Sequence, residues 1–158
     1  MKKLLNLLLS LTLVFALAGC GQEQSATYVL DVTQEGVHIV DTMTYKATGD
    51  IVYQMDENVT IDLSAVEEAA KEAMVAYYDE YYGAMGTDVP EGVVFETSYE
   101  NNIYTVVLNM NLKEADLQVL SERGYLMLTS ENGQTVQAIS LKQTGSYLEA
   151  QGYVLQEQ

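Results

Sequence analysis

The chain contains few of the residue types from which common functional sites are built. Its 158 residues include one cysteine, one histidine, one proline and no tryptophan. With a single cysteine, an internal disulfide is impossible. The C-x-x-C, H-E-x-x-H and EF-hand spacings of metal sites are absent, and so is a glycine-rich phosphate loop. We therefore expect no metal and no cofactor in this protein.

Basic residues are scarce as well. Seven Lys and Arg stand against 23 Asp and Glu, which gives a formal net charge of −16. Phosphate contacts require clustered Lys and Arg, so this composition argues against nucleic-acid binding. The same charge repels anionic lipid headgroups. We interpret the acidity as a source of solubility, in preference to a role in cation binding.

The only cysteine lies directly after a segment that is typical of a secretory signal. Two lysines precede the apolar run 4–18, which is shorter than the roughly 20 residues that span a bilayer. Residues 17–20, LAGC, resemble the lipobox of bacterial lipoproteins. This resemblance implies cleavage before Cys20 and attachment of a diacylglycerol to its thiol. The less favoured alternative is a secreted protein with a free thiol, which is a liability in an oxidising compartment.

The predicted organisation has three parts. Residues 1–19 form a lipoprotein signal peptide, residues 20–26 the lipidated cysteine and a short polar linker, and residues 27–158 a single domain. Acyl chains on Cys20 anchor the protein to the cell membrane at its extracytoplasmic face, because two chains hold a protein stably. The mature part loses two lysines and keeps five basic and 23 acidic residues, so its formal net charge is −18.

Much of the domain alternates between apolar and polar residues, which is typical of antiparallel strands. In the second predicted strand Asp41 interrupts the apolar face, and the third puts Ile51, Met55 and Ile61 on one side. Residues 125–138 are either a strand or a loop. The five predicted strands are 27–33, 37–46, 51–61, 93–99 and 103–112.

A helical period replaces this alternation after the third strand. The helix begins at Ser64, which forms a capping box with Glu67, or at Asp62, and it ends near Met85. Its apolar side chains recur at helical spacing and predict the face that packs on the sheet. These stripe residues are Val66, Ala70, Ala73, Tyr77, Tyr81 and Ala84.

Two shorter helices are predicted towards the C-terminus. The first covers residues 113–123. The second begins with a capping box between Ser140 and Gln143 and ends at Gly152, which resembles a Schellman stop. The predicted fold class is α+β: an antiparallel β-sheet with a long central helix and one or two shorter C-terminal helices packed on one face.

The segment YYDEYY, residues 77–82, is the most unusual feature of the long helix. Aromatic rings near a helix end can hold a ligand by stacking or by cation–π contacts. Tyr77, Tyr78, Tyr81 and Tyr82 are therefore candidate ligand-binding residues. The favoured alternative is that these rings pack in the core and at its rim.

Residues for acid–base or nucleophilic chemistry form no recognisable catalytic pattern. His38 falls in the middle of a predicted strand, where we expect it on the surface, and no G-x-S-x-G surrounds a serine. The acids along residues 67–80 are expected on the solvated face of the helix. We therefore expect a non-enzymatic binding or accessory module, with a small ligand or an envelope protein as its partner. The alternative is a carboxylate-based hydrolase that acts on cell-wall or peptide substrates.

Several motifs together resemble one family. The lipobox is followed by TYKATGDIVYQ (44–54), TSYENNIYTVVLNMNL (97–112) and ISLKQTGSYLEAQGYV (139–154). Their order and spacing are similar to those of small YehR-like bacterial lipoproteins, a family with a domain of unknown function. The resemblance implies an envelope location and a shared fold, and it supplies no active site.

Overall fold

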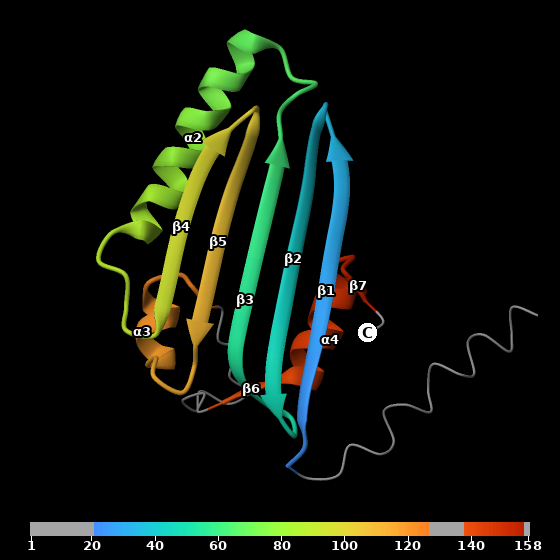
Figure 1. Ribbon diagram of the computed structural model, residues 1–158, viewed down its shortest axis with the longest axis vertical. Helices are drawn as coiled ribbons and strands as arrows, with labels where there is room; N and C mark the ends of the chain where they lie inside the picture. The colour runs from blue at the N-terminus through green and yellow to red at the C-terminus, as the bar shows by residue number, and fades with distance from the viewer. Residues whose placement is uncertain (1–20, 127–137, 157–158) are drawn as a thin grey trace, which may run out of the picture.

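The computed structural model describes residues 21–126 and 138–156. The predicted signal peptide and Cys20 lie outside the described residues, as does the stretch 127–137, for which the sequence allows a strand or a loop. The described residues form an antiparallel sheet of seven strands and three helices, which confirms the α+β class (Figure 1). No helix among these residues combines the length and the apolar character that crossing a membrane requires.

The sheet has the order β4-β5-β3-β2-β1-β7, and β6 pairs with β3. All five strands predicted from the sequence are present, and the first begins at Glu23, inside the predicted linker. The strands are β1 (Glu23–Gln34), β2 (Val37–Thr48), β3 (Ile51–Asp62), β4 (Val93–Glu100), β5 (Ile103–Asn111), β6 (Ile139–Ser140) and β7 (Val154–Leu155). The helices are α2 (Glu68–Gly86), α3 (Leu117–Glu122) and α4 (Leu141–Ala150).

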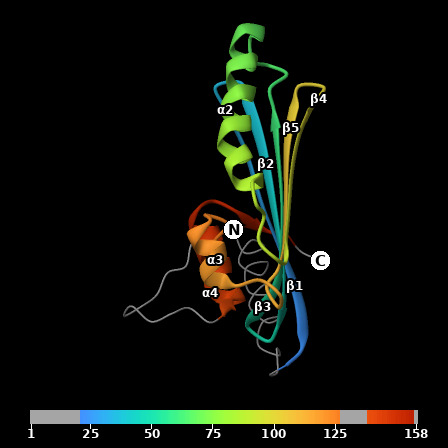
Figure 2. The ribbon, with the colours of Figure 1, turned by 90° about the vertical axis from the view of Figure 1, so that its left-hand side faces the viewer.

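The helices lie on one side of the sheet and divide that face between them. In Figure 2, where the sheet is seen edge-on, α2 lies beside its upper half and α3 and α4 beside its lower half. The opposite face, which points towards the viewer in Figure 1, carries no helix. We call these the covered face and the open face.

Three clusters of buried apolar side chains lie on the covered face. The first includes residues of α2, the second residues of α4 and the third residues of α3. Full burial of a side chain of leucine size stabilises the fold by about 1.5–3 kcal/mol, so these clusters hold the helices in place. The first contains Val59, Ile61 and Val106 with Met74 and Tyr78; the second Tyr28, Tyr45 and Leu148; the third Leu108, Met110 and Leu120.

The long helix begins later than its capping box predicts. A carboxylate oxygen of Asp62 accepts a hydrogen bond from the Ser64 amide at 2.8 Å, which closes a turn before the helix. Helix α2 starts at Glu68, and its N-cap residue Glu67 makes no side-chain cap hydrogen bond. Both predicted starts, Ser64 and Asp62, are therefore wrong: Asp62 binds the Ser64 amide in a turn, and the helical hydrogen bonds begin at the Glu67 carbonyl.

Inside the helix the predicted buried stripe is also wrong by one position, whereas Val66, before its first residue, packs against the first cluster as predicted. Tyr77 and Tyr81 are 61% and 57% exposed, whereas Tyr78 and Tyr82 pack against the sheet. Both rows contain tyrosines at helical spacing, so periodicity alone does not choose between them. The row that turns inward adds Met74 and buries more apolar area than the alanine-rich row, which decides the orientation.

A β-bulge in β3 reverses one predicted orientation. Lys46 pairs with Gln54 and Ala47 with Val52, so one residue of β3 is left without a partner in β2. Val52 therefore points into the core, with 3% of its surface exposed, and Ile51 is 59% exposed. The predicted burial of Ile51 assumed an unbroken alternation, which the bulge interrupts.

The C-terminal helix follows its sequence signals closely. The Ser140 hydroxyl accepts a hydrogen bond from the Gln143 amide at 3.1 Å, which confirms the predicted cap. Gly152 has φ +97°, and the Tyr153 amide donates to the Leu148 carbonyl at 3.0 Å, as in a Schellman stop. A Cβ at Gly145 would overlap the Tyr28 hydroxyl of β1, which explains a glycine inside this helix.

Candidate functional site

Two carboxylates from neighbouring strands lie on the covered face of the sheet. Asp41 of β2 is opposite Val59 of β3, and Met43 is opposite Glu57. The two acids are therefore diagonal neighbours on one face, within reach of each other's side chains. We call Asp41 and Glu57 the acid pair.

The acid pair lies at the boundary between two of the apolar clusters. Along β2, Val37 and Ile39 belong with α2, and Tyr45 belongs with α4. Asp41 lies between them on the same face, because alternate residues of a strand share a face. The apolar core is thus interrupted where the region beneath α2 meets the region beneath α4.

Asp41 is buried and only half satisfied. Only 8% of the surface of Asp41 is exposed. Its Oδ2 accepts a hydrogen bond from the Tyr153 hydroxyl at 2.5 Å. Its Oδ1 is buried and has no hydrogen-bond partner among the described residues. A buried polar atom without a partner costs about 1–3 kcal/mol, so this oxygen destabilises the fold.

The position of Tyr153 follows from the end of α4. The Schellman stop turns the chain at Gly152, and β7 then pairs with β1 through Tyr28 and Val29. Tyr153 lies between the helix and this short strand, so its hydroxyl reaches Asp41 across 112 residues of sequence. The C-terminal segment therefore completes the environment of a β2 side chain.

Burial and mutual repulsion change the acidity of the pair. Burial raises the pKa of Asp41, and the hydrogen bond from Tyr153 opposes this effect. Burial, and next the charge of Asp41, raise the pKa of Glu57 from 4.5 to about 7. Because a partly desolvated carboxylate beside a second, buried one ionises reluctantly, Glu57 changes its charge near neutral pH.

The charge of the acid pair affects the pKa values of three tyrosines. Burial raises the pKa of Tyr45, Tyr82 and Tyr153, and the carboxylates of Glu57 and Asp41 raise each pKa further. Together these effects raise the pKa of Tyr82 to about 12. These side chains come from β2, from α2 and from the segment after α4. We call the five residues Asp41, Glu57, Tyr45, Tyr82 and Tyr153 the acid–tyrosine cluster.

Two positive side chains in the described residues form ion pairs with other acids. Lys71 contacts Glu68 at 3.1 Å, and Arg123 contacts Asp88 at 2.8 Å. None of the ion pairs in the described ranges includes a member of the acid pair. In the described residues the pair therefore has no ion-pair partner.

The four tyrosines that the sequence suggested as a ligand shelf do not share a surface. Tyr77 and Tyr81 stack on the outer side of α2, with ring centroids 6.2 Å apart, and Tyr78 and Tyr82 turn towards the sheet. Of the four, Tyr82 belongs to the acid–tyrosine cluster. Cys20, the predicted lipid attachment site, lies outside the described residues.

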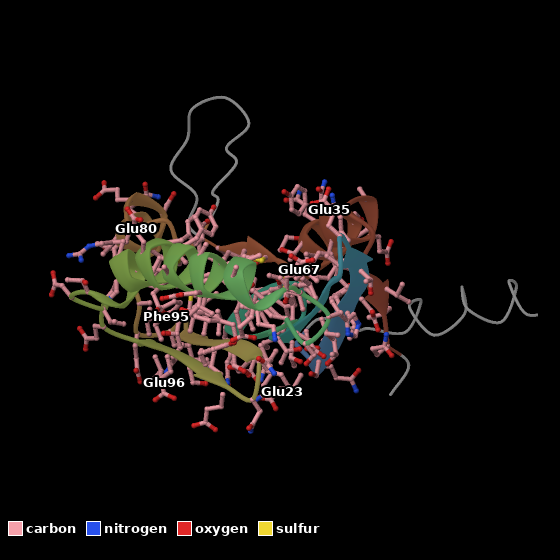
Figure 3. All side chains as sticks on the ribbon, turned by 90° about the horizontal axis from the view of Figure 1, so that it is seen from above. Glu23, Glu35, Glu67, Glu80, Phe95 and Glu96 are labelled. Carbon is pink, nitrogen blue, oxygen red and sulfur yellow. The ribbon has the colours of Figure 1, made fainter. Side chains whose placement is uncertain are left out.

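The other acid–base candidates also lie apart from the cluster. His38 Nε2 is 2.8 Å from Asp31 Oδ1 at an exposed position, as expected for a surface strand histidine. Figure 3 shows Glu80 on the side of α2 that faces away from the sheet and Glu96 beyond the open face. Asp79 accepts a hydrogen bond from Tyr104 at 2.9 Å and has a structural partner.

The sequence carried a signal for this site that was not interpreted as one. Asp41 interrupts the apolar alternation of β2, and Glu57 interrupts that of β3 between Met55 and Val59. Two such interruptions on strands that pair predict two acids on one buried face. No group of three or more His, Cys, Asp and Glu that could hold a metal occurs in the described part of the chain.

Comparisons with known proteins agree with this fold. Among solved structures, the chain is similar to the NMR structure of the Escherichia coli YehR protein, with 18% identity, a TM-score of 0.56, and coverage of 85% of this chain and 91% of that one. It is also similar to the NMR structure of a protein from Streptococcus pneumoniae TIGR4, with 16% identity, a TM-score of 0.51 and coverage of 87% of each chain. No curated protein matches the chain.

A family model provides the assignment. The family model for the protein of unknown function DUF1307 matches residues 24–154. This range covers all seven strands and omits only the first residue of β1 and the last residue of β7. The match therefore spans the fold and the acid–tyrosine cluster. The resemblance to YehR-like proteins is confirmed, and the chain belongs to the DUF1307 family.

Proposed function

We propose that this protein is a lipid-anchored, non-enzymatic binding module at the extracytoplasmic face of the bacterial cell membrane. The acid–tyrosine cluster carries the proposal. A carboxylate oxygen that is buried without a partner destabilises the protein by itself, and a bound ligand offsets that cost. Proteins tolerate such local costs mainly at functional sites.

The sequence before β1 supports the proposed location. The lipobox ends at Cys20, and β1 begins at Glu23. Three residues span at most about 10 Å, so acyl chains on Cys20 would hold this end of the sheet close to the bilayer. The formal charge of −18 on the mature chain repels anionic headgroups, so we assign the anchoring to the acyl chains.

The location is tested by labelling with a fatty acid in a bacterial host. The full-length chain is expected to carry the label and to sediment with membranes, and Cys20→Ala is expected to lose the label. Equal labelling of both chains, or recovery of the wild-type chain in the soluble fraction, would contradict the proposed anchor.

The binding role is tested by thermal unfolding of the full-length protein in a neutral detergent. The ligand panel contains wall fragments, short peptides, sugars, amines and divalent cations. A ligand at one hundred times its Kd adds about 2.7 kcal/mol to the free energy of unfolding, which raises Tm by several degrees. We expect a selective increase in Tm that disappears in Asp41→Asn. If every ligand that raises Tm does so equally in Asp41→Asn, the cluster is not the binding site.

A carboxylate-based hydrolase acting on cell-wall or peptide substrates is the second candidate. One observation favours it: Glu57, with a pKa of about 7, lies beside a second carboxylate, as in acid–base pairs with divided roles. Hydrolysis that is lost in both Glu57→Gln and Asp41→Asn would establish this function. Turnover that survives in both variants would exclude the pair as its catalyst.

A further inference from the structure

No ion pair within residues 21–126 and 138–156 involves the acid–tyrosine cluster. Lys46 Nζ donates to Gln54 at 3.3 Å, and Lys71 Nζ donates to Glu68 and Asn102 at 3.1 and 3.2 Å. These cations are therefore engaged elsewhere. A buried carboxylate is normally paired or neutralised, because desolvation of an isolated charge is costly. A group that brings a positive charge would therefore complement Asp41 and Glu57.

The acceptors that remain in the cluster match a group with several donors. Asp41 Oδ1 is buried without a partner, and neither the Glu57 carboxylate nor the Tyr82 hydroxyl has a hydrogen bond among the described residues. These atoms belong to β2, β3 and α2, and Asp41 and Glu57 are diagonal neighbours on the covered face. A primary ammonium group carries three N–H donors and no acceptor, so its donors match one oxygen from each residue.

The composition of the cluster favours an ammonium over a metal ion. Calcium takes six to eight oxygen ligands and magnesium requires a near-octahedral set. The described residues contain no group of three or more acidic, histidine or cysteine side chains suited to a metal. Tyrosine faces attract organic cations through cation–π contacts, and Tyr45, Tyr82 and Tyr153 provide such rings.

The cluster is partly exposed and bordered by apolar groups. Asp41 is buried, but Glu57, Tyr82 and Tyr153 are each only partly buried. Met43, opposite Glu57, and Met55 are partly buried and pack at the edge of the second cluster. Methionine adapts its shape to an apolar neighbour, so it suits the carbon stem of an amine.

From this geometry we propose that the acid–tyrosine cluster binds the primary ammonium group of a small organic amine between Asp41 and Glu57. The inference rests on the proposed binding function and specifies its ligand class. Asp41 Oδ1 accepts one N–H, Glu57 accepts a second, and Tyr82 accepts the third. The hydroxyl of Tyr153 holds Asp41 in place through the opposite carboxylate oxygen.

The test is isothermal titration of the full-length protein in a neutral detergent at pH 8, with n-butylammonium as the probe. Neutral n-butanol has the same stem without the charge, and tetramethylammonium has the charge without N–H donors. We expect n-butylammonium to bind, n-butanol not to bind, and tetramethylammonium to bind at least tenfold more weakly. Calcium and magnesium chlorides complete the panel.

Two variants and a matched control connect binding to the site. Asp41→Asn and Glu57→Gln each remove one charged acceptor and are expected to weaken binding about 10- to 100-fold. Asp56→Asn is the control: it removes an equal charge next to Glu57 in sequence, but from the open face, where Asp56 accepts from Gln54. Its affinity is expected to stay within about twofold of wild type.

The outcomes separate this inference from the binding function itself. Absence of n-butylammonium binding, or equal binding in Asp41→Asn, Glu57→Gln and wild type, overturns the ammonium site. Binding of calcium or magnesium that Asp41→Asn abolishes also overturns it and replaces it with a metal site, and the binding function then stands. If no ligand of the wider panel depends on Asp41, both proposals fail together.

Discussion

Glu57 is a residue whose charge near neutral pH depends on the fold. Its pKa rises from 4.5 to about 7 because it is partly desolvated and lies beside Asp41. The other groups that face it are the hydroxyls of Tyr45 on β2, Tyr82 on α2 and Tyr153 after α4. None of these is positively charged, so ionisation of Glu57 in the folded protein has no electrostatic compensation.

This shift predicts a pH-dependent effect of Glu57→Gln. Between about pH 4.5 and 7, the folded protein keeps a proton on Glu57 that the unfolded chain releases, so stability falls as pH rises through this range. Glutamine has no such proton and escapes the loss. Urea unfolding should show Glu57→Gln more stable than wild type by about 1–3 kcal/mol at pH 8, and nearly equal at pH 4.5.

The control for this experiment is again Asp56→Asn. It changes the net charge equally, so a general effect of reducing the negative charge appears in both variants. A stability difference between Glu57→Gln and wild type that stays constant from pH 4.5 to pH 8 would show that Glu57 has an ordinary pKa in the folded protein.

At the scale of the elements, α2 presents two tyrosine rows with opposite environments. Tyr82 packs with Phe95 and Tyr104, whereas Tyr81 is 57% exposed. We expect Tyr82→Ala to lower the free energy of unfolding by about 2–4 kcal/mol, because a large ring leaves a packed site. Tyr81→Ala, one residue earlier, should change it by less than about 0.5 kcal/mol. Similar losses in both variants in a urea titration would mean that α2 packs through the alanine-rich row.

Helix α4 allows a second comparison of matched sites. A Cβ at Gly145 overlaps the hydroxyl of Tyr28, whereas Gly83 in α2 has nothing within 4 Å of that position. Gly145→Ala should destabilise the protein by about 1–3 kcal/mol, since overpacking outweighs the better helix propensity. Gly83→Ala should stabilise it by up to about 1 kcal/mol. A stabilising Gly145→Ala, measured by thermal unfolding, would contradict the close packing of α4 on β1.

The elements show which features local sequence signals can predict. The strands were predictable because alternation spans many residues, and the hairpin between β4 and β5 was predictable because Asn101 and Asn102 adopt the positive φ of a tight turn. The face of α2 and the bulge in β3 were not predictable, because each depends on the area buried against a distant partner.

At the scale of the molecule, the candidate site depends on contacts that are distant in sequence. The interruptions of β2 at Asp41 and of β3 at Glu57 are visible in the sequence, but they do not identify the tyrosines of the cluster. Tyr153 reaches it from 112 residues away, and Tyr82 approaches from a helix whose orientation was predicted wrongly. A site assembled in this way requires the register of the sheet and the path of the C-terminal segment.

The contact between Asp41 and Tyr153 makes the C-terminal segment part of the core. Tyr153→Phe removes the hydroxyl that donates to Asp41. In the wild-type background it should lower the free energy of unfolding by about 1–3 kcal/mol, because both oxygens of the buried Asp41 carboxylate then lack partners. In an Asp41→Val background the same change should cost less than about 0.5 kcal/mol. Replacing a buried charge by an apolar side chain is often neutral or stabilising, so this background is expected to fold.

A double-mutant cycle therefore measures the coupling, with an expected interaction energy of at least about 1 kcal/mol. Tyr147→Phe on the exposed side of α4 is the matched control, because it removes a hydroxyl from a ring that is 56% exposed. Denaturant titrations of the four proteins give the four free energies of unfolding. If Tyr153→Phe lowers the free energy of unfolding equally in the wild-type and Asp41→Val backgrounds, the hydroxyl stabilises the segment without the carboxylate. The C-terminal segment would then be held by β7 pairing and by the end of α4 alone.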